Sequence, residues 1–221
     1  MSDSRDSIAN TFLVAIGVSL VCSVLVSAAA VLLQPLQEQN ERLYRQQIVL
    51  EVAGLYEPGI DIEERFAAID SERVELAGGD AAEVFVVRDG GAVEQVILPV
   101  SGPGLWSTMY GYLSLEADGS TVRGLRFYEH AETPGLGDQV EKADWLAKWP
   151  GKQLFDANGD VRIEVVRGQV ADSDNAIYQV DGMSGATLTG RGVTALLHHW
   201  AGPLGFGPYL QNISSEAAGD E

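Results

Sequence analysis

Positive charge is scarce in this chain. Lysine and arginine together number 14 against 32 aspartates and glutamates, which gives a formal net charge of -18 over 221 residues. A surface this acidic repels nucleic-acid phosphates and anionic lipid headgroups. We therefore expect no nucleic-acid partner and a well solvated exterior for the folded part.

Cysteine and histidine are scarce as well. The single cysteine, Cys22, lies inside an apolar segment, so no intrachain disulfide can form. Of the three histidines, His198 and His199 are adjacent and splay apart on a helix, which makes them a poor chelating pair. We expect no metal site.

The motifs of self-contained enzymes are also missing. No GxGxxG run follows a predicted strand, and the sequence contains no P-loop, no Cys-His zinc spacing and no nucleophile elbow. We expect neither a dinucleotide site nor catalytic residues within this chain.

One long apolar run is present near the start. Residues 11–33 contain no charge and as a helix would span roughly 34 Å, enough to cross a bilayer. A cleaved signal peptide is the alternative, with an A-x-A-like site at residues 28–30. The leader, residues 1–10, carries Asp3, Arg5 and Asp6 and is not net positive, which favours a retained transmembrane helix.

The charges beside this helix do not decide its orientation. Arg5 precedes it, whereas Arg42 and Arg45 follow it. Residues 34–76 are predicted to be a helical connector. Leucines seven apart mark an amphipathic helix over residues 36–55, Pro58-Gly59 ends it, and a short helix with a loop follows over residues 60–76.

Residues 77–211 are predicted to be an α+β domain with an antiparallel sheet and flanking helices. Turn sequences separate three pairs of β-rich runs, at residues 84–88 with 93–100, 110–117 with 121–130, and 153–155 with 161–166. A helix is expected over residues 138–149, with Trp145 and Trp149 in the core. The acidic tail, residues 212–221, is expected to be flexible.

Hydroxyl and small residues concentrate in residues 181–190. A strand is predicted before them, over residues 176–180, and a helix after them. Loops of this kind aim backbone N–H groups outward and can hold a phosphate, and Gly185 and Ala186 leave the Thr187 hydroxyl open to close approach. The plainer alternative is an ordinary helix start at which Thr187 or Thr189 is the N-cap.

The run Asp181-x-x-Ser184-Gly185-Ala186-Thr187-Leu188-Thr189 resembles the acceptor motif of FMN-binding domains that a flavin transferase modifies. The resemblance implies a phosphoester between FMN and the Thr187 hydroxyl, made from FAD by that separate enzyme. It also implies that Asp181 and Ser184 help the transferase to recognise the loop, and that the neighbouring residues contact the cofactor. Gly190 departs from the motif, in which serine is common.

A second stretch, residues 130–137, resembles the other signature of the same family, and residues 102–111 add a third. The resemblance implies that these loops lie beside the flavin. The residues expected to line or shape its pocket are Gly104, Leu105, His130, Glu132, Thr133, Gly135 and Leu136. From the residues alone, the His and Glu could equally be ordinary structural residues.

Together with the apolar helix, these stretches resemble the C subunits of sodium-translocating NADH:quinone reductases. That family implies an electron-relaying subunit of a bacterial inner-membrane complex that couples ubiquinone reduction to sodium export, with the soluble domain in the periplasm and no NADH oxidation by this subunit alone. The G subunit of the Rnf electron transport complex shares two of the motifs and is the alternative within the family. A non-catalytic FMN-binding sensor or a structural anchor is the alternative outside it.

Overall fold

The computed structural model describes residues 8–219; residues 1–7, most of the predicted leader, and residues 220–221, the end of the predicted tail, lie outside the described residues. The chain divides into two compact units, one up to Tyr44 and one from Arg45 onward.

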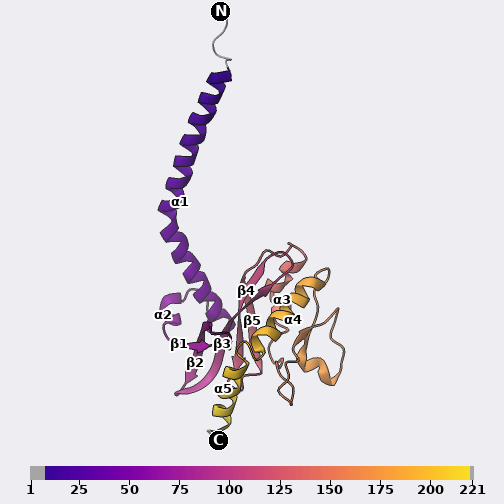
Figure 1. Cartoon of the computed structure of the whole chain (residues 1–221). Helices are drawn as coiled ribbons and strands as arrows, with labels where there is room; N and C mark the ends of the chain where they lie inside the picture. Colours follow the sequence, from indigo (N-terminus) through magenta and orange to yellow (C-terminus); the bar gives the residue numbers. More distant parts are fainter. Residues whose placement is uncertain (1–7, 220–221) are drawn as a thin grey trace, which may run out of the picture. The chain divides into compact units, whose positions relative to one another are not determined.

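The first unit is helical. Helix α1 (Ile8–Val52) contains the whole predicted transmembrane run and continues into the second unit (Figure 1). Its apolar side chains from Phe12 to Leu36 are exposed, and it is long and apolar enough to cross a membrane. Pro35 lies inside it, although we predicted a new helix after this residue. A proline removes one backbone donor and strains the preceding turn, but the helix formers around it continue the helix here.

The second unit is built on a five-stranded antiparallel sheet in the order β1-β2-β3-β4-β5. Its strands are β1 (Asp70–Glu75), β2 (Ala81–Asp89), β3 (Ala92–Pro103), β4 (Thr108–Glu116) and β5 (Val122–Glu129). Each strand pairs with the next along the chain, with Phe85 opposite Ile97 and Leu98 opposite Leu113. The first two predicted hairpins and the α+β class are confirmed.

Alternating side chains give this sheet two cores. Val96, Leu98 and Val100 of β3 point to the larger core, which α4 (Thr187–Ala201) and α5 (Gly207–Gly219) cover. Ile97 points to the opposite face, where the last turns of α1 pack. Because side chains in a strand alternate between faces, an uninterrupted apolar run fits a sheet buried on both sides.

The first strand was not predicted. Residues 70–75 were expected to be part of a short helix and loop, but only α2 (Ile62–Phe66) is helical and β1 follows it. The strand is polar because it lies at the sheet edge, where charged side chains face water. Arg88 on β2 holds it through ion pairs to Asp70 and Glu72.

The segment after β5 is more broken than predicted. In place of one helix over residues 138–149 there is a 3-10 turn, η1 (Gly137–Glu141), and then α3 (Ala143–Leu146), with Lys142 extended between them. The break lets Val140 and Trp145 both enter the core, where Trp149 is also fully buried. The core role predicted for the two tryptophans is confirmed.

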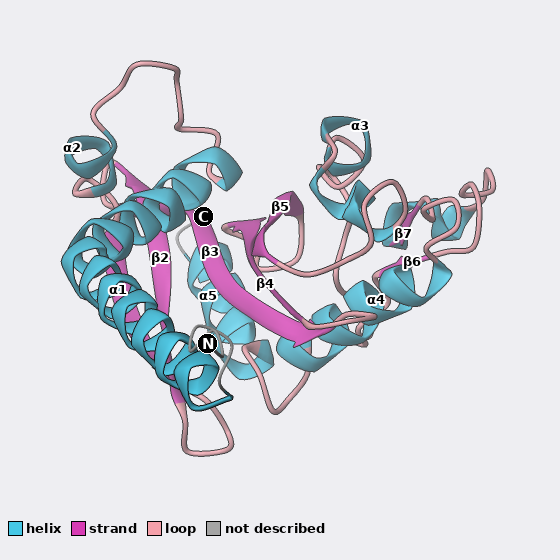
Figure 2. Ribbon diagram, turned by 90° about the horizontal axis from the view of Figure 1, so that it is seen from above, coloured by secondary structure: helices cyan, strands magenta, loops and turns pink. Residues whose placement is uncertain are grey.

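The third predicted hairpin is mostly loop. Its two runs meet at one bridge, between Phe155 and Val161. Strand β6 (Glu164–Val165) instead pairs in parallel with β7 (Gln179–Val180), beside α4 (Figure 2). A 3-10 turn, η2 (Asp174–Tyr178), occupies the first part of the strand predicted over residues 176–180.

Helix α5 corrects the prediction for the tail. It runs to Gly219, so residues 212–219 are helical rather than flexible coil. Leu210 and Ile213 are buried in the larger core and hold the first turns of the helix in place. Sequence reasoning weighed the small and acidic residues and overlooked these apolar residues at helical spacing.

Candidate functional site

The acceptor loop, residues 181–186, connects β7 to helix α4. Gly185 has a φ of +76°, a left-handed conformation that favours glycine, and it turns the chain into the helix. The N-cap is Ala186, and its side chain makes no capping hydrogen bond. The first turn of α4 therefore presents backbone N–H groups that no side chain of the N-cap satisfies.

Thr187 is the first residue of α4, and its side chain is exposed. The alternative in which Thr187 or Thr189 caps the helix is wrong, because the chain enters the helix one residue earlier and with no hydroxyl at the cap. The Thr187 hydroxyl lies at the positive end of a helix of 15 residues, a position that favours a negatively charged group.

Thr189 is buried, and its hydroxyl donates to Glu132 Oε2 at 2.5 Å. The other carboxylate oxygen of Glu132 accepts from Leu105 N at 2.7 Å and from Trp106 N at 3.4 Å. Glu132 itself is 5% exposed. Its carboxylate thus joins three segments that are far apart in the sequence: residues 104–106, residues 130–137 and the first turn of α4.

Two glycines allow this close packing. A Cβ on Gly137 would lie 2.6 Å from Glu132 Oε2 and 2.8 Å from Thr189 Oγ1, and one on Gly104 would overlap Glu132 Oε1. His130 accepts a hydrogen bond from Glu132 N through Nδ1, while its Nε2 lies 2.7 Å from Glu141 Oε1. We refer to Glu132, Thr189, Gly104, Gly137 and the Leu105 amide as the Glu132 clasp.

Apolar side chains surround the outer end of this clasp. Leu105, Trp106, Leu136 and Leu188 are all exposed. Trp106 donates from Nε1 to Thr133 Oγ1 at 3.0 Å, and the tip of Leu136 lies against the open side of Gly185. Gly135 has a φ of +78° and provides the turn before Leu136. These residues offer flat apolar surface beside the acceptor loop.

Asp181 anchors the start of the loop. Its Oδ2 accepts from Lys148 Nζ at 2.7 Å and its Oδ1 from Val170 N at 2.7 Å, while its carbonyl accepts from Trp145 Nε1 at 2.9 Å. The Lys148 hydrogen bond, followed by that from Val170, lowers the pKa of Asp181 below its ordinary value of 3.8. Asp181 therefore ties the loop to α3 and to the chain after β6.

Gln139 holds the middle of the loop. Its Nε2 donates to Ser184 O at 3.0 Å and to Leu136 O at 2.7 Å, whereas the Ser184 side chain is exposed. Gly190, where the motif commonly has serine, is buried, and a Cβ there would lie 3.1 Å from Val165 Cγ1. The glycine thus allows β6 to approach α4 closely.

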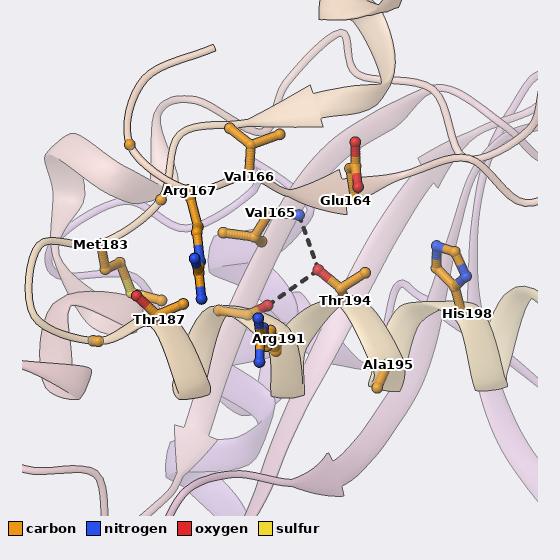
Figure 3. A pocket seen from close by; sticks show the side chains of 14 residues that line it. Glu164, Val165, Val166, Arg167, Met183, Thr187, Arg191, Thr194, Ala195 and His198 are labelled. Atoms are coloured by element: carbon orange, nitrogen blue, oxygen red, sulfur yellow. Dashed lines mark hydrogen bonds between the residues drawn. The ribbon is translucent and has the colours of Figure 1, made fainter.

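A cavity of about 490 Å³ opens on the other side of the first turn of α4. One wall is the helix face formed by Thr187, Arg191, Thr194 and His198, which recur at helical spacing. Residues 164–168 form the opposite wall, and Thr194 fastens the two by accepting from Val165 N at 2.9 Å (Figure 3). The remaining lining residues are Gly182, Met183, Ala186, Gly190 and Ala195.

The structure therefore divides the residues predicted for the site. Of the fourteen, only Ala186 and Thr187 line this cavity. Those from residues 104–105 and 130–136 lie on the clasp side, where Glu132 already bonds to protein groups. Sequence reasoning missed Arg167 and Arg191. The four-residue spacing from Thr187 to Arg191 was a usable signal, but the approach of Arg167 depends on the β6–β7 pairing.

The described residues include no group of three His, Cys, Asp or Glu side chains able to hold a metal ion. The arrangement instead suits a phosphate ester of modest size. It combines an exposed hydroxyl, an uncapped helix start, two guanidinium groups and adjoining apolar surface. Among the cofactors that the sequence suggested, FMN fits these features, since it joins a phosphate to a flat ring system.

Comparison with known proteins agrees with this fit. The FMN-binding domain family matches residues 104–202. The C subunit of the Na(+)-translocating NADH-quinone reductase of Pseudomonas aeruginosa is 40% identical over 95% of this chain and 97% of that protein. The protein of the same name from Vibrio parahaemolyticus is 39% identical over 96% of this chain and 98% of that protein.

Solved structures give the same result. The crystal structure of Shewanella oneidensis NqrC superposes with a TM-score of 0.70 at 33% identity, covering 77% of this chain and 96% of that one. The corresponding protein from Parabacteroides distasonis gives 0.67 at 27% identity, covering 80% and 96%. The sequence resemblance is thereby confirmed: this chain belongs to the family of C subunits of sodium-translocating NADH:quinone reductases and contains its FMN-binding domain.

Proposed function

We propose that this chain carries FMN covalently on Thr187 and relays electrons as the C subunit of a sodium-translocating NADH:quinone reductase. The observation that carries the proposal is the position of the Thr187 hydroxyl, exposed at an uncapped helix start beside a cavity with two guanidinium groups. When bound, FMN supplies one-electron and two-electron redox chemistry.

The attachment needs little from the chain itself. The Thr187 oxygen forms a bond to the FMN phosphorus of FAD, the pyrophosphate bond breaks, AMP leaves, and the hydroxyl proton is lost. A flavin transferase supplies the catalysis, so no base beside Thr187 is required. Asp181 holds the start of the loop and Gln139 holds its middle, which keeps the hydroxyl accessible to that enzyme.

The apolar surface on the clasp side gives the flavin ring a place to pack. Leu105, Leu136 and Leu188 are exposed there, close to the acceptor loop. Glu132 supports this surface from beneath by bonding the Leu105 amide. We propose that these loops shape the ring's surroundings, which is how a protein tunes a flavin.

The chain acts within a complex. Helix α1 anchors it in the bacterial inner membrane, and the domain lies on the periplasmic side. Neighbouring subunits deliver and remove electrons, coupling ubiquinone reduction to sodium export. Protease added from the periplasmic side should digest the domain; digestion only from the cytoplasmic side would reverse this orientation.

Intact mass tests the proposal directly. The full chain, expressed with a flavin transferase and denatured, should gain the mass of one FMN phosphoester and fluoresce on a denaturing gel. Thr187→Val nearly preserves shape but removes the oxygen, so it should lose the added mass completely, while Thr189→Val should keep it. A flavin mass that remains in Thr187→Val and disappears in Thr189→Val would move the attachment to Thr189.

The electron-relay part has a separate test. The purified flavinylated chain should show no NADH oxidation by itself. Rapid turnover with NADH would contradict a relay role. A colourless wild-type chain after coexpression would favour the alternative of a structural anchor with an unused motif.

A further inference from the structure

The cavity beside Thr187 contains two cations whose charge is not used within the fold. Arg167 follows β6 and Arg191 lies one turn after Thr187 on α4. Within the described part of the chain, neither guanidinium makes an ion pair or a hydrogen bond. Figure 3 shows Arg167 reaching from the opposite wall toward the first turns of the helix.

Arg65 and Arg73 also make no ion pair with a described residue, but of these four arginines only Arg167 and Arg191 line the cavity beside Thr187. Acidic residues outnumber basic ones by 32 to 14, and most cations of the second unit pair with an acid or a carbonyl. Those with a carboxylate partner within 4 Å include Arg88, Arg123, Arg126, Lys142, Lys148 and Arg162. Arg167 and Arg191 are exposed to solvent and line one cavity, so two guanidinium groups there are available to an incoming anion.

The other charged groups of the cavity do not supply that anion. Glu164 makes no ion pair with either arginine and accepts a hydrogen bond from Gln179 Nε2 at 2.7 Å. His198 contacts Ile163 O through Nε2 at 2.8 Å, so its ring is held against the β6 segment. The arginines thus remain available to an incoming group.

The four-residue spacing on α4 places Arg191 near the Thr187 hydroxyl. Residues four apart lie on the same face of a helix about 5–6 Å apart at Cβ, so Arg191 stands directly above Thr187. Guanidinium groups bind phosphate oxygens in a bidentate manner, which a lysine ammonium cannot do. A phosphate bonded to Thr187 Oγ1 would lie within reach of the long Arg191 side chain.

We propose that Arg167 and Arg191 form a binding site for the phosphate of FMN, before and after its attachment to Thr187. This inference deepens the proposed function and rests on it for the identity of the ligand. It assigns the cavity side of α4 to the phosphate and leaves the clasp side to the ring. The pair also offsets the acidity of the chain where an anionic cofactor must approach.

Binding without the covalent bond tests this site. The full-length Thr187→Val chain in detergent micelles is titrated with FMN and with riboflavin, which lacks the phosphate, at low salt, and flavin fluorescence is followed. FMN should bind at least tenfold more tightly than riboflavin. Adding Arg167→Ala and Arg191→Ala should remove that preference and leave riboflavin binding unchanged, and inorganic phosphate should compete only when both arginines are present.

A matched control distinguishes specific phosphate binding in the cavity from a general effect of the chain's net charge. Arg65→Ala with Arg73→Ala removes the same two charges from exposed positions outside the cavity, and it should preserve the preference. Arg167→Lys with Arg191→Lys should keep part of it. Equal affinity for FMN and riboflavin in the Thr187→Val chain would overturn the proposal, as would a preference that survives loss of both arginines or disappears equally in the control.

The two proposals fail separately. If Thr187 is not the attachment residue, the mass measurement changes but the FMN preference persists. If the arginines do not bind phosphate, the mass measurement stands and the preference is absent. In the flavinylated chain, the phosphorus NMR resonance should shift on loss of both arginines and not in the Arg65 and Arg73 control.

Discussion

The two sides of the first turn of α4 differ in how completely their polar groups are satisfied. On one side, the buried Glu132 carboxylate accepts from Thr189 and from the Leu105 amide, with glycines packed against both oxygens. On the other side, Arg167 and Arg191 line an open cavity. The Glu132 clasp fixes the position of Thr187. The cavity leaves room for the FMN phosphate that Thr187 is proposed to carry. Stability and ligand binding should therefore respond to different residues.

Breaking the clasp should have the largest effect on stability. Glu132→Ala leaves the Leu105 amide and the Thr189 hydroxyl without their acceptor and opens a void, so the free energy of unfolding should fall by about 3 kcal/mol. Denaturant unfolding of the detergent-solubilised chain, followed by tryptophan fluorescence, measures this loss.

Glu129→Ala is the control for that variant, since this glutamate is exposed at the end of β5. It should change stability by less than about 0.5 kcal/mol. Equal losses in the two variants would mean that the clasp is no more than surface contact.

A smaller change on the same side is Thr189→Val. It preserves shape and removes the hydroxyl that donates to Glu132, so stability should fall by about 2 kcal/mol, because a hydrogen bond to a charged group is lost in a buried site. The same experiment on Thr187→Val should show almost no change, since that hydroxyl is exposed. The reverse order would contradict the assignment of the two threonines.

Asp181 extends the comparison to the start of the loop. Its lowered pKa means that its stabilising contribution is present above the ordinary value of 3.8 and is lost as the pH falls through the lower pKa of the folded state. Asp181→Asn should cost about 1 kcal/mol near pH 7, and wild type and variant should converge in acid.

Unfolding measured at several pH values tests this behaviour, with Asp144→Asn on α3 as an exposed control. A difference between wild type and Asp181→Asn that stayed constant down to about pH 2 would show that the Lys148 pair does not depend on the charge of Asp181.

The smallest effect on stability belongs to the cavity side. Arg167→Ala and Arg191→Ala should each change the free energy of unfolding by less than about 0.5 kcal/mol, because no bond within the described fold is lost. The same unfolding experiment applies. A loss above about 1 kcal/mol from either change would mean that the arginine supports the fold. The clasp and the cavity would then no longer differ in their effect on stability.

Local patterns predicted much of this fold. The turn at Asp118-Gly119 and the alternating runs on either side located β4 and β5 within two residues. The glycine and threonine pattern predicted a helix after residues 181–190, but α4 begins at Thr187, inside the predicted loop. Each of these depends on neighbours in the sequence. Strand β1 was not predicted because it is held by ion pairs to Arg88 on the next strand and shows no apolar alternation.

The sequence suggests the centre of the candidate site, and most of its surroundings depend on the fold. Thr187 follows from a local motif, whereas the partners of Glu132 lie 27 and 57 residues away and nothing local indicates them. The resemblance placed Glu132 and Thr133 beside the flavin, and the structure adds their bonds to Thr189 and Trp106. The cavity depends on the parallel pairing of β6 with β7, two strands too short to leave a pattern.

The end of helix α1 limits how far the chain can be truncated from its N-terminal side. Ile48, Val49 and Leu50 are at most 1% exposed and cover Phe85, Ile97 and Tyr112 on the sheet. Each such apolar side chain contributes about 1.5–3 kcal/mol when buried. A water-soluble fragment that keeps the native sheet must therefore start no later than about residue 45, where the second unit begins, and a protease that trimmed beyond that point would release an aggregating domain.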